Sequence, residues 1–177
     1  DRPTPISLVQ HHCFNLGDGP AVLDHRVTIP AARYTEPGPD LLPTGAVLPV
    51  AGTPYDFRAG RTLRDAHGSP LDYDVNLALS KTRDLTIPAA MVESPTGDLV
   101  LRLWSDRPGL QVYNSVTTDV AASGLDGRRY GRYSGLCLED QDWPGALAQP
   151  HFPSIVVTPE RPYRHWCEIE IAEPSRP

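Results

Sequence analysis

The 177-residue sequence has no long apolar run, few aromatic residues and no excess of positive charge. No stretch approaches the roughly 18 consecutive apolar residues of a membrane-spanning helix, so we expect no membrane partner. Acidic side chains outnumber basic ones by 22 to 16, which gives a net charge of −6. Nucleic-acid binders usually carry a basic surface, so nucleic acid is not an expected partner. With 20 prolines and 14 glycines, the composition predicts one loop-rich folded domain over residues 1–177.

Common motifs for nucleotide, metal and hydrolase chemistry are also missing. The chain contains no GxxxxGK[ST], GxGxxG, HExxH or GxSxG pattern. Cys13, Cys137 and Cys167 are odd in number and widely spaced, and the histidines are scattered apart from the adjacent His11 and His12. This spacing predicts buried free thiols, with neither a disulfide framework nor a metal site. Unpaired thiols and the absence of a secretory leader favour the cytoplasm, and the start at Asp1 predicts a processed, trimmed or cut N-terminus.

Short apolar and β-branched stretches separated by Pro, Gly and Asp clusters predict an all-β protein. Alternation is clearest at 99–104 and 166–171, which both read as half-buried strands. The Pro and Gly between Val92 and Leu99 predict a hairpin there. Helix should be scarce, with short turns near 62–66 or 119–123. The expected strands are 6–10, 27–29, 85–92, 99–105, 110–115, 136–139, 155–158 and 166–171.

Titratable residues follow two apolar stretches. His11 and His12 come after an apolar run at 6–9, so one of them must point inward if this segment is a strand. An inward histidine can titrate near neutral pH, and the alternative is a histidine hydrogen-bonded within the core. Glu139 ends the apolar run 135–138, where partial desolvation would raise the pKa of its carboxyl toward that of a general base. A solvated strand end is the alternative.

Other polar and aromatic residues suit a polyhydroxylated ligand. Asp74 and Gln111 can hydrogen-bond sugar hydroxyls, although each alone also fits a turn or surface position. Among the tryptophans, Trp104 and Trp166 fit packing in a β core. Trp143, in the loop after Glu139, is the better candidate for stacking on a ligand.

Taken together, these segments resemble the C-terminal half of the aldose 1-epimerase, or galactose mutarotase, family. The stretch SLVQHHCFNLG at 7–17 looks like the family's Leu-Thr-Asn-His-Ser-Tyr-Phe-Asn-Leu segment, and the order and approximate spacing of the later motifs agree. Any one motif is weak, but the ordered series is specific. The remaining matches are 23–25, 32–35, 42–45, 49–58, 73–76, 108–113, 135–139, 151–154 and 163–165.

The resemblance implies a fold, a reaction and roles for four residues. The implied fold is a large antiparallel β-sandwich of the galactose mutarotase type, and the implied reaction interconverts the α and β anomers of a hexose such as galactose or glucose. The family's general base falls on Glu139 and its general acid on His11, with sugar-hydroxyl contacts on Asp74 and Gln111. A monosaccharide is then the substrate, and no metal or organic cofactor is required.

This sequence departs from the family pattern around the implied acid. Gln10, His12 and Cys13 stand where the family has Asn, Ser and Tyr, and Val75 replaces a His that commonly follows the matched Asp. The family's N-terminal half, with an arginine and a second histidine that contact the sugar, has no counterpart in this sequence. We therefore expect either a fragment, one chain of a two-part assembly, or a short form whose site is completed by a second copy.

Two rival hypotheses remain at the level of sequence. The missing half also fits a non-catalytic carbohydrate-binding or structural partner derived from the same family. A phosphorylated sugar is a further alternative substrate, because the places of several arginines relative to the site are undetermined. These are Arg102, Arg107, Arg128, Arg129 and Arg132.

Overall fold

A computed structural model describes residues 2–174 and is built from strands and loops. Over these residues it contains twelve strands and one 3₁₀ turn, η1 (Leu125–Gly127). No helix within 2–174 has the length and apolar character needed to cross a bilayer. The strands are β1 (Thr4–Pro5), β2 (Cys13–Phe14), β3 (Arg26–Thr28), β4 (Arg33–Pro37), β5 (Pro43–Pro49), β6 (Asp74–Ala78), β7 (Ala90–Glu93), β8 (Val100–Ser105), β9 (Gly109–Tyr113), β10 (Leu136–Gln141), β11 (Val156–Val157) and β12 (Cys167–Ala172).

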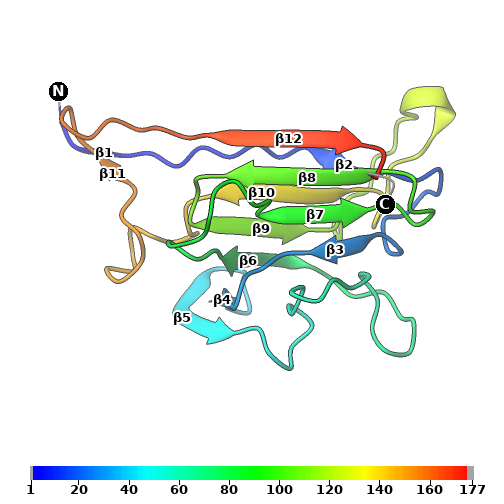
Figure 1. Ribbon diagram of the computed structural model, residues 1–177, viewed down its shortest axis with the longest axis horizontal. Helices are drawn as coiled ribbons and strands as arrows, with labels where there is room; N and C mark the ends of the chain where they lie inside the picture. Colours follow the sequence, from blue (N-terminus) through cyan, green and yellow to red (C-terminus); the bar gives the residue numbers. More distant parts are fainter. Residues whose placement is uncertain (1, 175–177) are drawn as a thin grey trace.

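Two larger antiparallel sheets stack to form a sandwich, which confirms the all-β expectation (Figure 1). The six-stranded sheet has the order β2-β10-β9-β6-β4-β5, and the four-stranded sheet has the order β12-β8-β7-β3. β1 and β11 form a separate two-stranded ribbon, which extends from one end of the sandwich (Figure 1). The expected hairpin is present, because β7 pairs with β8 and Gly97 supplies the positive φ of +73° in its turn.

The hydrophobic core lies between the two larger sheets. Leu101 and Leu103 of β8 belong to it, as do Leu110 and Val112 of β9, and all four are fully buried. Each pair has the two-residue spacing of side chains on one face of a strand. The residues between them, such as Gln111, face the opposite side of the sheet. The core therefore decides which side chains the six-stranded sheet presents outward.

Several expected elements differ in the structure. Residues 6–10 form no strand beyond β1, and Leu8 is 59% exposed, so the apolar character of this segment does not reflect core packing. Of 85–92, only Ala90 onward is β-strand, because Asp84 accepts hydrogen bonds from Thr86 in a turn. The helical turns expected at 62–66 and 119–123 do not form, and η1 lies just beyond the second of them. Local propensity was a weak guide in these segments, because pairing and packing with the rest of the fold decide which of them become regular structure.

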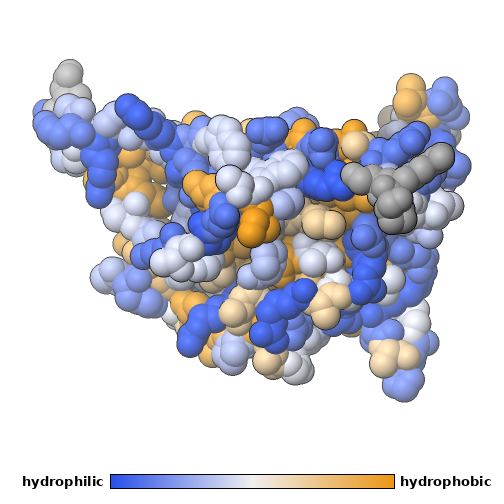
Figure 2. All heavy atoms as spheres, in the orientation of Figure 1, coloured by the Kyte–Doolittle hydropathy of each residue, from blue (hydrophilic) through white to orange (hydrophobic). Residues whose placement is uncertain are grey.

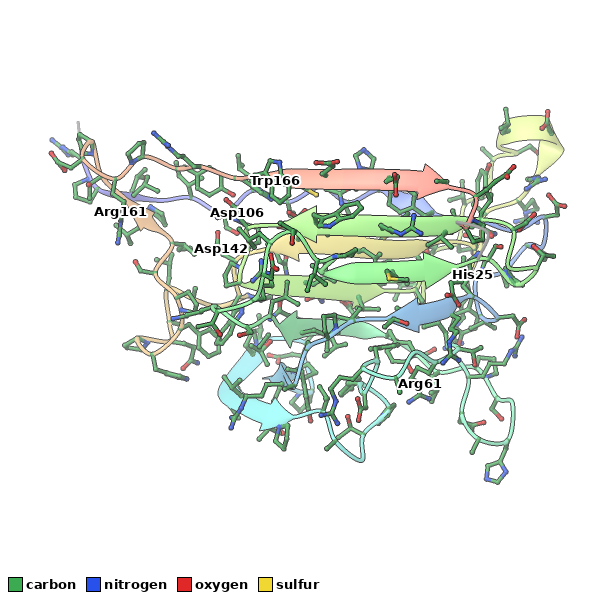
Figure 3. All side chains as sticks on the ribbon, viewed as in Figure 1. His25, Arg61, Asp106, Asp142, Arg161 and Trp166 are labelled. Carbon is green, nitrogen blue, oxygen red and sulfur yellow. The ribbon has the colours of Figure 1, made fainter. Side chains whose placement is uncertain are left out.

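The expected burial of tryptophans and thiols was partly wrong. Trp166 is 42% exposed and lies just before β12 on the outside of the sandwich (Figure 3). Trp104 is half-buried, with its indole N–H donating to the Thr86 carbonyl. Of the three free cysteines only Cys137 is buried, whereas Cys13 is exposed. Apolar patches also interrupt the hydrophilic surface over the four-stranded sheet (Figure 2).

Candidate active site

The outward face of the six-stranded sheet gathers three of the predicted site residues. β9 pairs with both β10 and β6, so Gln111 lies opposite Glu139 on one side, and Tyr113 lies opposite Asp74 on the other. Opposed side chains on antiparallel strands have Cβ atoms about 4.5–5.5 Å apart. Residues that are far apart in the sequence thus meet on one surface of the sheet.

His11 contacts Glu139 directly. Its Nε2 lies 3.0 Å from Glu139 Oε1, and the side chains are 56% and 8% exposed. The inward-pointing histidine was expected only if this segment is a strand, but the segment before β2 is not one, and His11 and His12 are both exposed. The strand register explains this contact. β2 and β10 are antiparallel and pair Cys13 with Cys137, so the residue two positions before Cys13 lies opposite the residue two positions after Cys137. Its ring also meets Tyr113 edge-on, with centroids 5.7 Å apart.

The surroundings of Glu139 raise the pKa of its carboxyl above the ordinary value. Burial raises the pKa of its carboxyl, and the negative charge of Asp74 raises it further, whereas His11 opposes the shift. With its side chain only 8% exposed, Glu139 is not the solvated strand end that the sequence left open. A carboxyl held in this way is better matched to proton transfer at neutral pH than an exposed glutamate.

Asp74 and Gln111 form a hydrogen-bonded pair beside the acid–base contact. Gln111 Nε2 donates to Asp74 Oδ1 over 2.7 Å, and Gln141 Nε2 donates to Gln111 Oε1 over 3.2 Å. The amides are therefore oriented by their neighbours. A carboxylate that accepts and amides that both donate and accept suit hydroxyl groups, which also do both.

The four predicted site residues line one cavity of about 460 Å³, which is within the size range of small-molecule sites. They are His11, Asp74, Gln111 and Glu139. Six other residues also line this cavity, and sequence reasoning missed all of them but the aromatic Tyr113. Two of them, Tyr113 and Gln141, lie two positions from Gln111 and Glu139, so the period of the strand was the signal that predicts them. The full lining is His11, Cys13, Asp74, Gln111, Tyr113, Thr117, Thr118, Glu139, Gln141 and Pro144.

Trp143 does not line this cavity. Its indole N–H donates to the Pro108 carbonyl over 2.8 Å, and its ring packs against Phe152 with centroids 4.9 Å apart. The expectation that it stacks on a ligand is not supported by this arrangement, because packing already uses both the ring and the N–H.

A larger cavity of about 650 Å³ adjoins the first and shares Cys13 and Thr118 with it. Arg128 and Arg129 line this second space, but neither His11 nor Glu139 does. The other three arginines in question are paired with acids elsewhere in the fold, namely Arg102 with Glu170, Arg107 with Asp106 and Arg132 with Asp72. The smaller cavity is therefore the candidate active site.

One group of possible metal donors occurs within residues 2–174, although the sequence spacing predicted none. A ligand atom from each of His11, Cys13 and Cys137 lies within 4.8 Å of the other two. The sheet register brings them together, since Cys13 and Cys137 are opposed across β2 and β10. Three such donors match the protein ligand count of an open zinc site, but they also overlap the acid–base pair.

Comparison with known proteins agrees with this architecture. The chain is 36% identical over 179 residues to galactose mutarotase from Homo sapiens, and the match covers 97% of this chain and 52% of that protein. It is 28% identical over 161 residues to aldose 1-epimerase from Escherichia coli, covering 86% and 46% of the two chains. The chain thus spans about half the length of the curated relatives it matches.

Solved structures show the same fold. An aldose epimerase homologue from C. elegans superposes with a TM-score of 0.81 at 27% identity, covering 97% of this chain and 51% of that one. Galactose 1-epimerase from Lactobacillus acidophilus superposes with a TM-score of 0.71 at 24% identity, covering 98% and 50%. The family model for aldose 1-epimerase matches residues 1–170. This chain, with the His11–Glu139 contact beside the outward face of a β-sandwich, therefore belongs to the aldose 1-epimerase family.

Proposed function

We propose that this chain is an aldose 1-epimerase that interconverts the α and β anomers of a hexose such as galactose or glucose. The observation that carries the proposal is the 3.0 Å contact between His11 Nε2 and Glu139 Oε1. It lies in a polar cavity of suitable size for one sugar ring. A proton acceptor and a proton donor within a few ångströms of each other are what opening a hemiacetal requires.

In the proposed mechanism, Glu139 acts as the base and His11 as the acid. The Glu139 carboxylate takes the proton of the C1 hydroxyl while protonated His11 gives a proton to the ring oxygen, and the bond between C1 and that oxygen breaks. Rotation about C1–C2 presents the other face of the aldehyde. Closure then returns both protons with the roles reversed. Each positioned group typically contributes about 10²–10⁴-fold, and the steps use no cofactor.

Asp74 and Gln111 are proposed to hold the sugar by its hydroxyl groups. Their mutual hydrogen bond of 2.7 Å keeps both side chains at the edge of the cavity. A bound hydroxyl can donate a hydrogen bond to Asp74 and accept one from the Gln111 amide. The hydrogen bond between Asp74 and Gln111 would then be replaced by hydrogen bonds to the ligand. Orientation of the ring by these contacts would place C1 near Glu139.

The half-length match leaves a second candidate function. The chain spans 52% of its human relative, which also favours a non-catalytic carbohydrate-binding or structural partner. We further propose that residues 1–177 form a single β-sandwich domain, and that a second chain or a second copy of this chain completes the site. The free thiols fit a reducing compartment, so the cytoplasm is the proposed location.

Polarimetry distinguishes the two functions. The approach of freshly dissolved α-D-galactose and α-D-glucose to anomeric equilibrium is followed with wild type, Glu139→Gln and buffer. The matched control is Glu168→Gln, an exposed glutamate on β12 of the other sheet. We expect acceleration by wild type and the control, and a loss of at least about 100-fold in Glu139→Gln. Equal rates for all variants would refute the catalytic role, and sugar binding by folded but inactive wild type would favour the binding module.

A further inference from the structure

Two thiols lie beside the acid–base pair without a role in the proposed chemistry. Cys13 of β2 and Cys137 of β10 are register partners, and their Sγ atoms are 2.8 Å apart. Opposed residues of antiparallel strands have Cα atoms about 4.5–5.5 Å apart, which is inside the range of about 4.4–6.8 Å that a disulfide needs. We propose that Cys13 and Cys137 form a reversible disulfide that ties β2 to β10 next to the His11–Glu139 contact.

The two thiols differ in access, which sets the order of the reaction. Cys13 is exposed, whereas Cys137 is buried. Cys13 is thus the thiol that meets an oxidant first. Its thiolate attacks a small-molecule disulfide such as oxidised glutathione, which forms a mixed disulfide and releases one glutathione thiol. Cys137 then loses its proton, attacks Cys13 Sγ and releases the second glutathione, so two protein thiols are oxidised and one glutathione disulfide is reduced.

A Cys13–Cys137 disulfide would lie where it can restrain His11. β2 is an edge strand of two residues, joined to β10 by only two register pairs. His11 lies just before β2, and its side chain is largely exposed. A covalent link between β2 and β10 therefore restrains the segment that carries His11 relative to the strand that carries Glu139. This inference concerns the bond itself and does not depend on the proposed activity.

Cys167 provides an internal control. It lies on β12, in the four-stranded sheet, and is half-buried. Its partner across the strand pair is Ser105, which has no thiol, so no disulfide within the chain is expected there. Oxidation should therefore join Cys13 to Cys137 and leave Cys167 as a free thiol.

The test exposes the reduced full chain to glutathione disulfide and maps its peptides by mass spectrometry without reduction. We expect one Cys13–Cys137 link, a fall from three free thiols to one, and reversal by dithiothreitol. Cys167→Ser should form the same link and Cys13→Ser should form none. Amide exchange across 11–16 should be slower in the oxidised chain.

Several results would overturn the proposal. These are a stable glutathione adduct on Cys13 without the link, a link that includes Cys167, or unchanged amide exchange across 11–16 after oxidation. Protection of both thiols that ends when a chelator is added would also overturn it, in favour of a metal bound by His11, Cys13 and Cys137.

Discussion

Replacing Arg107 with methionine should strongly destabilise the fold near the site. The Arg107 side chain is 14% exposed and lies 2.8 Å from Asp106 Oδ1 and 3.4 Å from Asp142 Oδ2. It also donates to the Arg164 carbonyl over 2.6 Å. Figure 3 shows Asp106 and Asp142 close together at this end of the sandwich. Methionine leaves Asp142, only 9% exposed, without its counter-ion, and removing one partner of a buried pair costs about 3–5 kcal/mol.

Urea denaturation measures this cost. A loss of 3–5 kcal/mol corresponds to a fall in midpoint of about 1–2 M urea at a slope of about 2.5–3 kcal/mol per M, the steep end of the usual range. The matched control is Arg102→Met, which breaks the ion pair with Glu170, whose side chain is 51% exposed, and should cost under about 1 kcal/mol. The Arg107 cost should shrink as acid protonates Asp142, whose pKa burial has already raised. A midpoint shift no larger than that of Arg102→Met, or one independent of pH, would refute the reasoning.

Two further predictions concern pH. Burial lowers the pKa of His25, so the unfolded chain binds its proton more readily, and stability should fall as the pH drops below about 6.5. Unfolding free energies measured across this range should decline less in a folded His25→Gln variant, and an identical decline would contradict the assignment. Burial and Asp74 raise the pKa of Glu139, so mutarotation should rise with pH through a value above the ordinary 4.5. Asp74→Asn should shift that limb of the kcat/KM profile to lower pH, and a shift to higher pH would count against Glu139 as the base.

Strand alternation and turn residues were readable along the chain because they depend on neighbouring residues. The hairpin of β7 and β8 and most of the strand at 166–171 formed where the alternation of apolar residues placed them. β4 and β5 were missed, since Pro and Gly interrupt their pattern and pairing with other strands stabilises them. Conversely, 6–10 has a strand-like composition but lies exposed, since no core surface covers it.

The sequence alone determined the all-β class, the family and the identity of Glu139, His11, Asp74 and Gln111 as candidates, because composition, periodicity and motif order are properties of the linear chain. Folding in three dimensions was needed to bring these four to one cavity, to place His11 in contact with Glu139, and to place Cys13 beside Cys137. The reason is register. The pairing of β2, β10, β9 and β6 sets which residues from distant parts of the chain become neighbours. Packing of the opposite face against the core sets which side chains point outward.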